Sequence, residues 1–287
     1  MKKLIERLLI FILGIPAVFA LVVLLPYCNH LVLNIFVIFF TAAGAVEFSI
    51  MLGKKQIRIP KAEAFILGAL APLAATLNLV LGPTQWIAPL ILMSGFGWVL
   101  ISRIFSRSEN MENIVNYIIG GFSVMVYPGF FTFWIVKMSM WNNSGAILLF
   151  LFLVFSNDSA AWLFGSLFGK NNRGIIQASP NKSISGFLGG ILVSLLFAGI
   201  AALLFPFIFT TNTAAPSSFP LLTALILGLF TGIFATLGDL AESAIKRSCD
   251  FKDSGNSVLG RGGVLDSIDS IAVAAPVFFL LFTVLVK

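Results

Sequence analysis

Long apolar runs separated by short polar breaks follow one another along the whole chain. An α-helix needs about 20 apolar residues to cross the hydrocarbon core of a bilayer, and runs of this length recur throughout. We therefore expect an all-α, polytopic integral membrane protein with no separate soluble domain. The pattern predicts about nine transmembrane helices, near residues 8–26, 31–52, 63–82, 85–102, 114–136, 145–168, 186–209, 219–241 and 268–286.

Composition supports this fold class. Of the 287 residues, 59% are hydrophobic and only 10% are charged, and the mean hydropathy is +1.02. Soluble domains carry roughly a quarter charged residues, so a water-soluble fold is excluded. The first apolar run begins like a signal peptide, but no cleavage site of small residues interrupts it, and we expect it to be retained as a helix.

Basic residues predict the orientation of the helices. With a cytoplasmic N-terminus and nine spans, only Lys137 and Lys287 of the 18 basic residues fall outside. Lysine and arginine in short loops are retained on the cytoplasmic side. We therefore expect the N-terminus in the cytoplasm, the C-terminus outside, and the protein in the cell membrane.

Polar chemistry is distributed unevenly between the two halves. Residues 1–144 are apolar, with Glu47 as an acid inside a span, and we interpret them as transmembrane scaffold helices. Residues 145–287 hold the most polar loops, at 169–185 and 242–267. We interpret this second part as the catalytic region of a single membrane-embedded unit, with its site facing the cytoplasm.

The segment 238–270 places dense charge beside the predicted bilayer. Its carboxylates include Asp239, Glu242, Asp253, Asp266 and Asp269. Asp266 and Asp269 are spaced to share one face at the start of the last helix, where the helix dipole favours carboxylates. Carboxylates with few histidines or cysteines suit Mg²⁺, which bridges protein carboxylates to substrate phosphates.

The same segment also offers groups for phosphate. The turn Gly260-Arg261-Gly262-Gly263 can expose backbone N–H groups, and nearby basic side chains supply positive charge. These side chains are Lys246, Arg247, Lys252 and Arg261. Together with the acids, they predict a site for a metal ion and nucleotide phosphates.

A second polar stretch begins within the sixth predicted span. It carries Asn157-Asp158, Gly169-Lys170, the run from Ser179 to Ser183, and Gly189-Gly190. Asp158 lies about ten residues from the end of its span, and an acid at such depth is costly enough to indicate function. We expect its partner to be a metal ion or a lysine.

These two stretches, taken together with their spacing, resemble the phosphatidate cytidylyltransferase family, also called CDP-diglyceride synthetases. The resemblance is strong from about residue 157 to 276 and rests only on hydropathy before that. It implies a multi-helix membrane enzyme, commonly a homodimer, that needs a divalent cation such as Mg²⁺, with a second cation possible. The implied reaction converts CTP and phosphatidate to CDP-diacylglycerol and pyrophosphate in phospholipid biosynthesis.

The resemblance also assigns residues. It implies that Asp239, Asp266 and Asp269 hold the metal ion and, with Lys246, form the catalytic group. The residues expected to bind the substrates are Asn157, Asp158, Lys170, Ser179, Lys182, Ser183, Ser243, Arg247, Lys252, Asp253, Arg261, Gly262 and Gly263.

Four positions depart from the family pattern. Asn181 stands where a lysine is usual, and Leu259 stands where the pattern has proline. Arg261 stands where it has histidine, and Ser267 stands where it has arginine. One guanidinium is thus lost at 267 and another gained at 261. We interpret this as a compensated variant that keeps activity; the alternative is an inactive relative or one with another substrate.

Other functions remain open on the sequence. A CTP-dependent lipid kinase or a related lipid cytidylyltransferase would share the metal site but differ in its products or head-group contacts. An ion-coupled transporter would use Asp158 and Asp239 as relays within the membrane. Charge gathered at one face, and the lack of paired broken helices, argue against the transporter.

Overall fold

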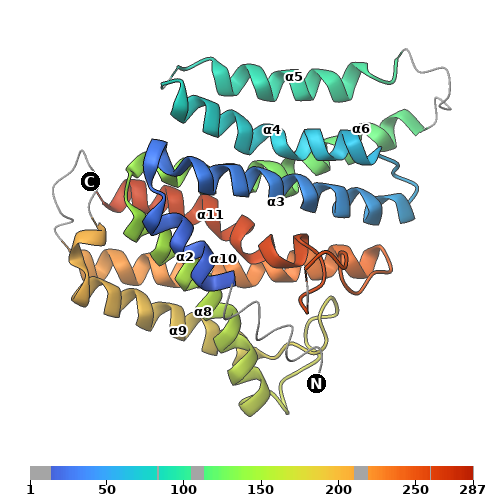
Figure 1. Ribbon diagram of the computed structural model, residues 1–287. Coiled ribbons are helices and arrows are strands. Elements are labelled where there is room, and N and C mark those ends of the chain that lie inside the picture. Colours follow the sequence, from blue (N-terminus) through green and yellow to red (C-terminus); the bar gives the residue numbers. More distant parts are fainter. Residues whose placement is uncertain (1–13, 83, 105–112, 210–218, 259, 287) are drawn as a thin grey trace. The chain divides into compact units, whose positions relative to one another are not determined.

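The computed structural model describes residues 14–82, 84–104, 113–209, 219–258 and 260–286 (Figure 1). These residues form helices and loops with two isolated bridges and no sheet, so the predicted all-α class is confirmed. The α-helices are α2 (Ile15–Leu24), α3 (Tyr27–Lys54), α4 (Lys61–Val80), α5 (Ile87–Ile101), α6 (Ile114–Val124), α7 (Phe131–Met138), α8 (Ser144–Phe168), α9 (Ile184–Leu204), α10 (Pro220–Ser248) and α11 (Leu265–Leu285).

Seven helical segments of the described chain are long and apolar enough to cross a membrane. One of them, Ile114–Trp141, joins α6 and α7 through a π-helical turn, Met125–Phe130, that contains Pro128. The chain is therefore a multi-pass membrane protein. The 15-residue α5 is shorter than these segments, and the predicted first span begins outside the described residues, so the count of nine and the orientation stay predictions.

The main difference from the predicted helix ends concerns α10. It continues to Ser248, whereas the sequence pattern ended the span at 241 and placed a loop from 242. The added residues include strong helix formers, and Lys246 and Arg247 lie in the last turn, where cations interact favourably with the helix dipole. A helix can therefore continue past its apolar part into the polar segment.

The chain divides into two compact units. The first comprises Met1–Met140 together with Ser248–Ser267, and the second comprises Trp141–Arg247 together with Ile268–Lys287. The boundary near 140 lies close to the predicted division at 144. The polar loop after α10, however, belongs to the unit that contains the N-terminal helices, although the sequence pattern grouped it with the catalytic region.

Within the first unit, α3 and α4 lie side by side (Figure 1). Gly68 on α4 faces Ala45 on α3 so closely that a Cβ could not be added there without displacement. The hydroxyls of Thr41 and Thr132 are 2.9 Å apart in a buried hydrogen bond between α3 and α7. Small residues and a satisfied polar pair allow helices to pack closely in a membrane, where lipid replaces water.

Glu63 on α4 links α4, α5 and α6. Its carboxylate accepts hydrogen bonds from Trp98 Nε1 at 2.6 Å, from Arg103 Nη2 at 2.7 Å, and from the Tyr117 hydroxyl. The Arg103 guanidinium also lies 4.1 Å from the centre of the Tyr117 ring. These contacts fix the adjacent ends of three helices.

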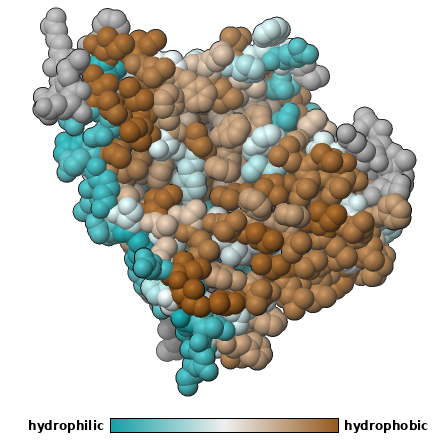
Figure 2. Space-filling view, turned by 180° about the vertical axis from the view of Figure 1, so that it is seen from behind, coloured by the Kyte–Doolittle hydropathy of each residue, from teal (hydrophilic) through white to brown (hydrophobic). Residues whose placement is uncertain are grey.

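Within the second unit, aromatic side chains of α11 pack against Trp141 and α8. Trp141 contacts Phe279 and Phe282 with ring centres 5.1 and 4.4 Å apart, and Phe150 of α8 contacts Phe278 at 5.1 Å. Alongside, α8 packs on α9. Figure 2 shows a face covered largely by hydrophobic side chains, which suits a protein surrounded by lipid.

Candidate active site

The second unit contains a cavity of about 510 Å³ formed by α8, α9, α10 and the loop before α9. Polar and charged side chains meet apolar ones in its wall. The polar lining includes Asn157, Asp158, Ser166, Arg173, Ser179, Asn181, Lys182, Ser183, Thr236 and Asp239, and the apolar lining includes Trp162 and Phe187. A cavity with this mixed lining can take a molecule that has both a charged and an apolar part.

The predicted pair Asn157 and Asp158 lies on α8 at this cavity, ten residues before the helix ends. The buried Asn157 amide donates to Thr236 Oγ1 of α10 at 3.2 Å. Asp158 Oδ1 accepts a hydrogen bond from Ser270 Oγ of α11 at 3.3 Å. A hydroxyl is thus one partner of Asp158, and the expected metal ion or lysine stays a prediction.

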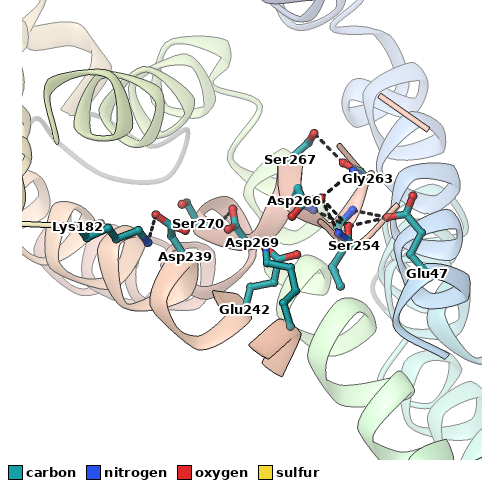
Figure 3. Close-up of polar contacts among 12 residues, drawn as sticks. Glu47, Lys182, Asp239, Glu242, Ser254, Gly263, Asp266, Ser267, Asp269 and Ser270 are labelled. Carbon is teal, nitrogen blue, oxygen red and sulfur yellow. Dashed lines mark hydrogen bonds and ion pairs between the residues drawn. The ribbon is translucent and has the colours of Figure 1, made fainter. Parts of the chain in front are cut away.

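The loop between α8 and α9 brings basic groups to the cavity. Lys182 forms an ion pair with Asp239 of α10 (Figure 3). Arg173 Nη2 donates to the Gly165 carbonyl at 2.8 Å, which ties the loop to the end of α8. Ser183 caps α9, because its Oγ accepts from the Gly186 amide at 3.1 Å. The loop is thus anchored at both ends while Lys182 faces an acid.

Two further acids and a lysine belong to the same unit. Glu242 is fully buried, and its Oε2 lies 3.2 Å from Lys246 Nζ, one helical turn along α10. The buried Asp269 of α11 interacts electrostatically with Asp239, Glu242 and Lys246. Asp269 thus lies near Asp239, Glu242 and Lys246, and the role of Asp239 and Asp269 as metal ligands stays a prediction.

Three predicted substrate-binding residues of this unit do not line the cavity. Lys170 is exposed in the turn after α8. On α10, Ser243 is half-buried and Arg247 is exposed. Their roles stay predictions.

The remaining predicted residues lie in the polar loop of the first unit. Asp266 Oδ2 accepts hydrogen bonds from the Gly263 amide at 2.7 Å, the Ser254 amide at 2.8 Å and the Ser254 hydroxyl at 2.9 Å (Figure 3). The loop turns at Gly262, whose φ of 111° is favourable only for glycine. Lys252, Asp253 and Arg261 are exposed. Asp266 lies in the first turn of α11, as predicted.

A carboxylate-held metal ion was predicted on Asp239, Asp266 and Asp269. The described residues contain no group of three or more histidine, cysteine or acidic side chains placed to hold a metal ion. Asp266 Oδ2 accepts hydrogen bonds from Gly263 and Ser254, whereas Asp239 and Asp269 lie near enough for their negative charges to repel, which a cation would relieve. Mg²⁺ often uses only one or two protein carboxylates and completes its shell with water and phosphate, so the donor chemistry of Asp239 and Asp269 fits it.

Several residues at these sites were not predicted from the sequence. Arg173 was not among the predicted site residues, and Thr236 is a polar residue inside an apolar run. Ser254 and Ser270 lie within the motif-bearing segment 238–270, and their place beside Asp266 and Asp158 could have singled them out. Glu47 of α3 also contacts the loop after α10, about 200 residues later, and nothing in the sequence indicates this contact.

Comparison with known proteins identifies the family of this chain. A family model described as the cytidylyltransferase family matches residues 5–285. The chain belongs to this family. Members of the cytidylyltransferase family that resemble it include the phosphatidate cytidylyltransferase of Bacillus subtilis (strain 168), 34% identical over 158 residues, which cover 54% of this chain and 55% of that protein.

Two other relatives match this chain over a comparable number of residues. The phosphatidate cytidylyltransferase of Haemophilus influenzae is 38% identical over 133 residues, covering 46% of this chain and 44% of that protein. The uncharacterized protein YnbB of Escherichia coli (strain K12) is 37% identical over 168 residues, covering 58% of this chain and 52% of that protein. The chain thus spans about half the length of the curated relatives it matches. The expected family resemblance is confirmed.

Proposed function

We propose that this protein is a phosphatidate cytidylyltransferase that converts CTP and phosphatidate to CDP-diacylglycerol and pyrophosphate. The observation that carries the proposal is the cavity of the second unit, where Lys182, Arg173 and Asp239 lie in the same wall as Trp162 and Phe187. A charged head group and an apolar tail match this lining. Two relatives named as phosphatidate cytidylyltransferases support the same substrates.

The proposed chemistry needs little from a general base. A phosphate monoester has a second pKa of about 6, so the attacking phosphatidate oxygen is largely ionised at neutral pH. This oxygen bonds to the α-phosphorus of CTP, the bond from that phosphorus to the bridging oxygen of the β-phosphate breaks, and pyrophosphate leaves with the electron pair. The main barrier is repulsion between two polyanions, which fixed cations reduce.

Residues of this chain supply those cations. We assign Lys182 and Arg173 to the phosphoryl oxygens at the cavity, with Asn157 and Ser183 as hydrogen-bonding groups of its wall. Asp239 holds the Lys182 ammonium in place until phosphate arrives. Lys246 is paired with Glu242, so we assign it the role of offsetting the negative charge of Glu242 and Asp269.

We assign Mg²⁺ to Asp239 and Asp269. Bound there, it would neutralise phosphate charge in the way that magnesium does in other phosphoryl-transfer enzymes. Asp266 and a second cation belong to the proposal only through the family resemblance. By the same resemblance we propose a homodimer in the cell membrane, with the site open to the cytoplasm, where CTP is found.

Release of pyrophosphate tests this function. The purified chain in mixed micelles should release pyrophosphate from CTP only when phosphatidate is present, and an enzyme-coupled assay measures it continuously. Diacylglycerol in place of phosphatidate is the matched control. Release of CDP instead would identify a CTP-dependent lipid kinase, and uptake of solute by proteoliposomes without any nucleotide product would identify a transporter.

A further inference from the structure

An acid of the N-terminal helices, Glu47 of α3, makes its hydrogen bonds with the polar loop that follows α10. Its partners Ser254, Ser257 and Leu265 are 207, 210 and 218 residues away in sequence. Glu47 is only 6% exposed. A buried carboxylate needs such partners, because an uncompensated charge away from water is costly.

Both oxygens of the Glu47 carboxylate are used. Oε2 accepts from the Leu265 amide at 2.9 Å, and Oε1 accepts from Ser257 Oγ at 2.8 Å. Oε2 also lies 3.0 Å from Ser254 Oγ (Figure 3). Hydrogen bonds to a charged acceptor are about twice as strong as neutral ones. The contacts at Ser254, Ser257 and Leu265 hold the segment at three points, with the single hydroxyl hydrogen of Ser254 shared between Glu47 and Asp266.

Ser254 connects Glu47 to Asp266. Its hydroxyl lies 3.0 Å from Glu47 Oε2 and 2.9 Å from Asp266 Oδ2, and it accepts from the Asp266 amide at 3.2 Å. The Ser254 amide donates to Asp266 Oδ2 at 2.8 Å. The place of the Asp266 carboxylate is therefore set through a residue that Glu47 holds.

The loop is also shaped around the Glu47 side chain. A Cβ added at Gly255 or at Gly263 would collide with the Glu47 carboxylate. Both positions are glycine, which lets the backbone approach this carboxylate from two directions. Such complementarity indicates that the acid and the loop form one structural feature.

We propose that Glu47 is a positioning residue for the reaction: it holds the loop after α10 and the first turn of α11 in the shape that orients Asp266, Lys252 and Arg261, without touching either substrate. The proposal rests on the proposed function for its kinetic consequence. Its structural part, that Glu47 orders the loop, is independent of the substrates.

Two substitutions of Glu47 distinguish a positioning role, which needs its hydrogen bonds, from a role that needs its negative charge. In Glu47→Gln, the amide oxygen can accept from Leu265 and Ser254, while the amide nitrogen donates to Ser257 Oγ, which can accept. Glutamine therefore preserves the contacts, whereas Glu47→Ala removes all three. A metal ligand or a proton-transfer group would lose its function in both variants.

The kinetic test compares these variants in the purified full chain with CTP and phosphatidate. We expect Glu47→Ala to lower turnover by about tenfold or more, the range for loss of a hydrogen bond to a charged group, and Glu47→Gln to stay within about threefold of the unsubstituted protein. The matched control is Glu63→Ala, which removes another multiply bonded acid of the first unit. It should lower the melting temperature but leave turnover of the folded protein within about twofold.

Hydrogen exchange of the loop, followed by mass spectrometry, tests the structural part. Exchange in peptides covering 250–265 should accelerate about tenfold or more in Glu47→Ala, and not in Glu47→Gln or Glu63→Ala. If Glu47→Ala does not fold, Ser257→Ala, which removes one donor, should show a smaller change in the same direction. The proposal would be overturned by full turnover in Glu47→Ala, or by equal losses of turnover in Glu47→Ala and Glu47→Gln. Unchanged exchange of the loop in Glu47→Ala, or in Ser257→Ala if Glu47→Ala does not fold, would also overturn it. Faster exchange in a protein without cytidylyltransferase activity would refute only the proposed function.

Discussion

Removing the Lys246 ammonium should destabilise the second unit strongly. Lys246 Nζ lies 3.2 Å from Glu242 Oε2, and the exposed fractions of the two side chains are 11% and 0%. Lys246→Met removes the ammonium that pairs with Glu242 and interacts with Asp269. The substitution therefore removes the positive charge while it keeps the length of the side chain.

The magnitude follows from burial. Breaking a buried ion pair by removing one partner costs about 3–5 kcal/mol, because the other charge stays buried and uncompensated. At about 2–4 °C per kcal/mol, the apparent melting temperature should fall by roughly 6–20 °C. Replacing both partners, in Glu242→Gln with Lys246→Met, should recover most of this loss.

Thermal unfolding in detergent, followed by tryptophan fluorescence, measures all four members of this cycle. A single Lys246→Met variant as stable as the unsubstituted protein, or a double variant no more stable than the single, would refute the reasoning. Turnover of the stable double variant then reports separately on Lys246, since a catalytic role predicts that activity stays low when stability returns.

Three further predictions concern other parts of the protein. Burial raises the pKa of the Cys249 thiol, so its alkylation at pH 8 should be slower in the folded protein than in the denatured one, as mass spectrometry of the modified peptide can show; equal rates in the two states would contradict this. Arg261→Ala should lower turnover by about tenfold, and Ser267→Arg added to it should restore part of that loss if the two positions compensate; no recovery would refute compensation. EDTA should abolish turnover and Mg²⁺ restore it, and Asp239→Asn should raise the Mg²⁺ concentration for half-maximal activity by about tenfold, measured by titration; an unchanged requirement would remove Asp239 from the metal site.

Most of the fold could be predicted from hydropathy. The ends of α3, α4, α5 and α8 agree with the predicted spans within a few residues, because apolar length and helix boundaries coincide there. The end of α10 did not follow from hydropathy, since Glu242 and Lys246 pair with each other and let the helix continue while buried. A hydropathy pattern records each residue alone and cannot show that two charges compensate.

The candidate site was predictable to the extent that its residues lie within the two polar stretches of the sequence. Asn157, Asp158, Lys182 and Asp239 were identified from their types and spacing, and the structure places all four at one cavity. Glu47 was not, because a lone acid in an apolar helix gives no indication of its partner. Its role depends on a contact with Ser254, 207 residues later, which only the folded chain reveals.

The fate of the nucleotide tests the central claim most directly. CTP labelled with ³H in the cytosine and with ³²P at the γ-phosphate is incubated with the purified protein, phosphatidate and Mg²⁺, and the lipid is extracted. The account predicts that the lipid carries ³H without ³²P, that ³²P appears in pyrophosphate, and that Asp269→Asn abolishes both. Lipid that carries ³²P without ³H, or label transfer that is unchanged in Asp269→Asn, would contradict it.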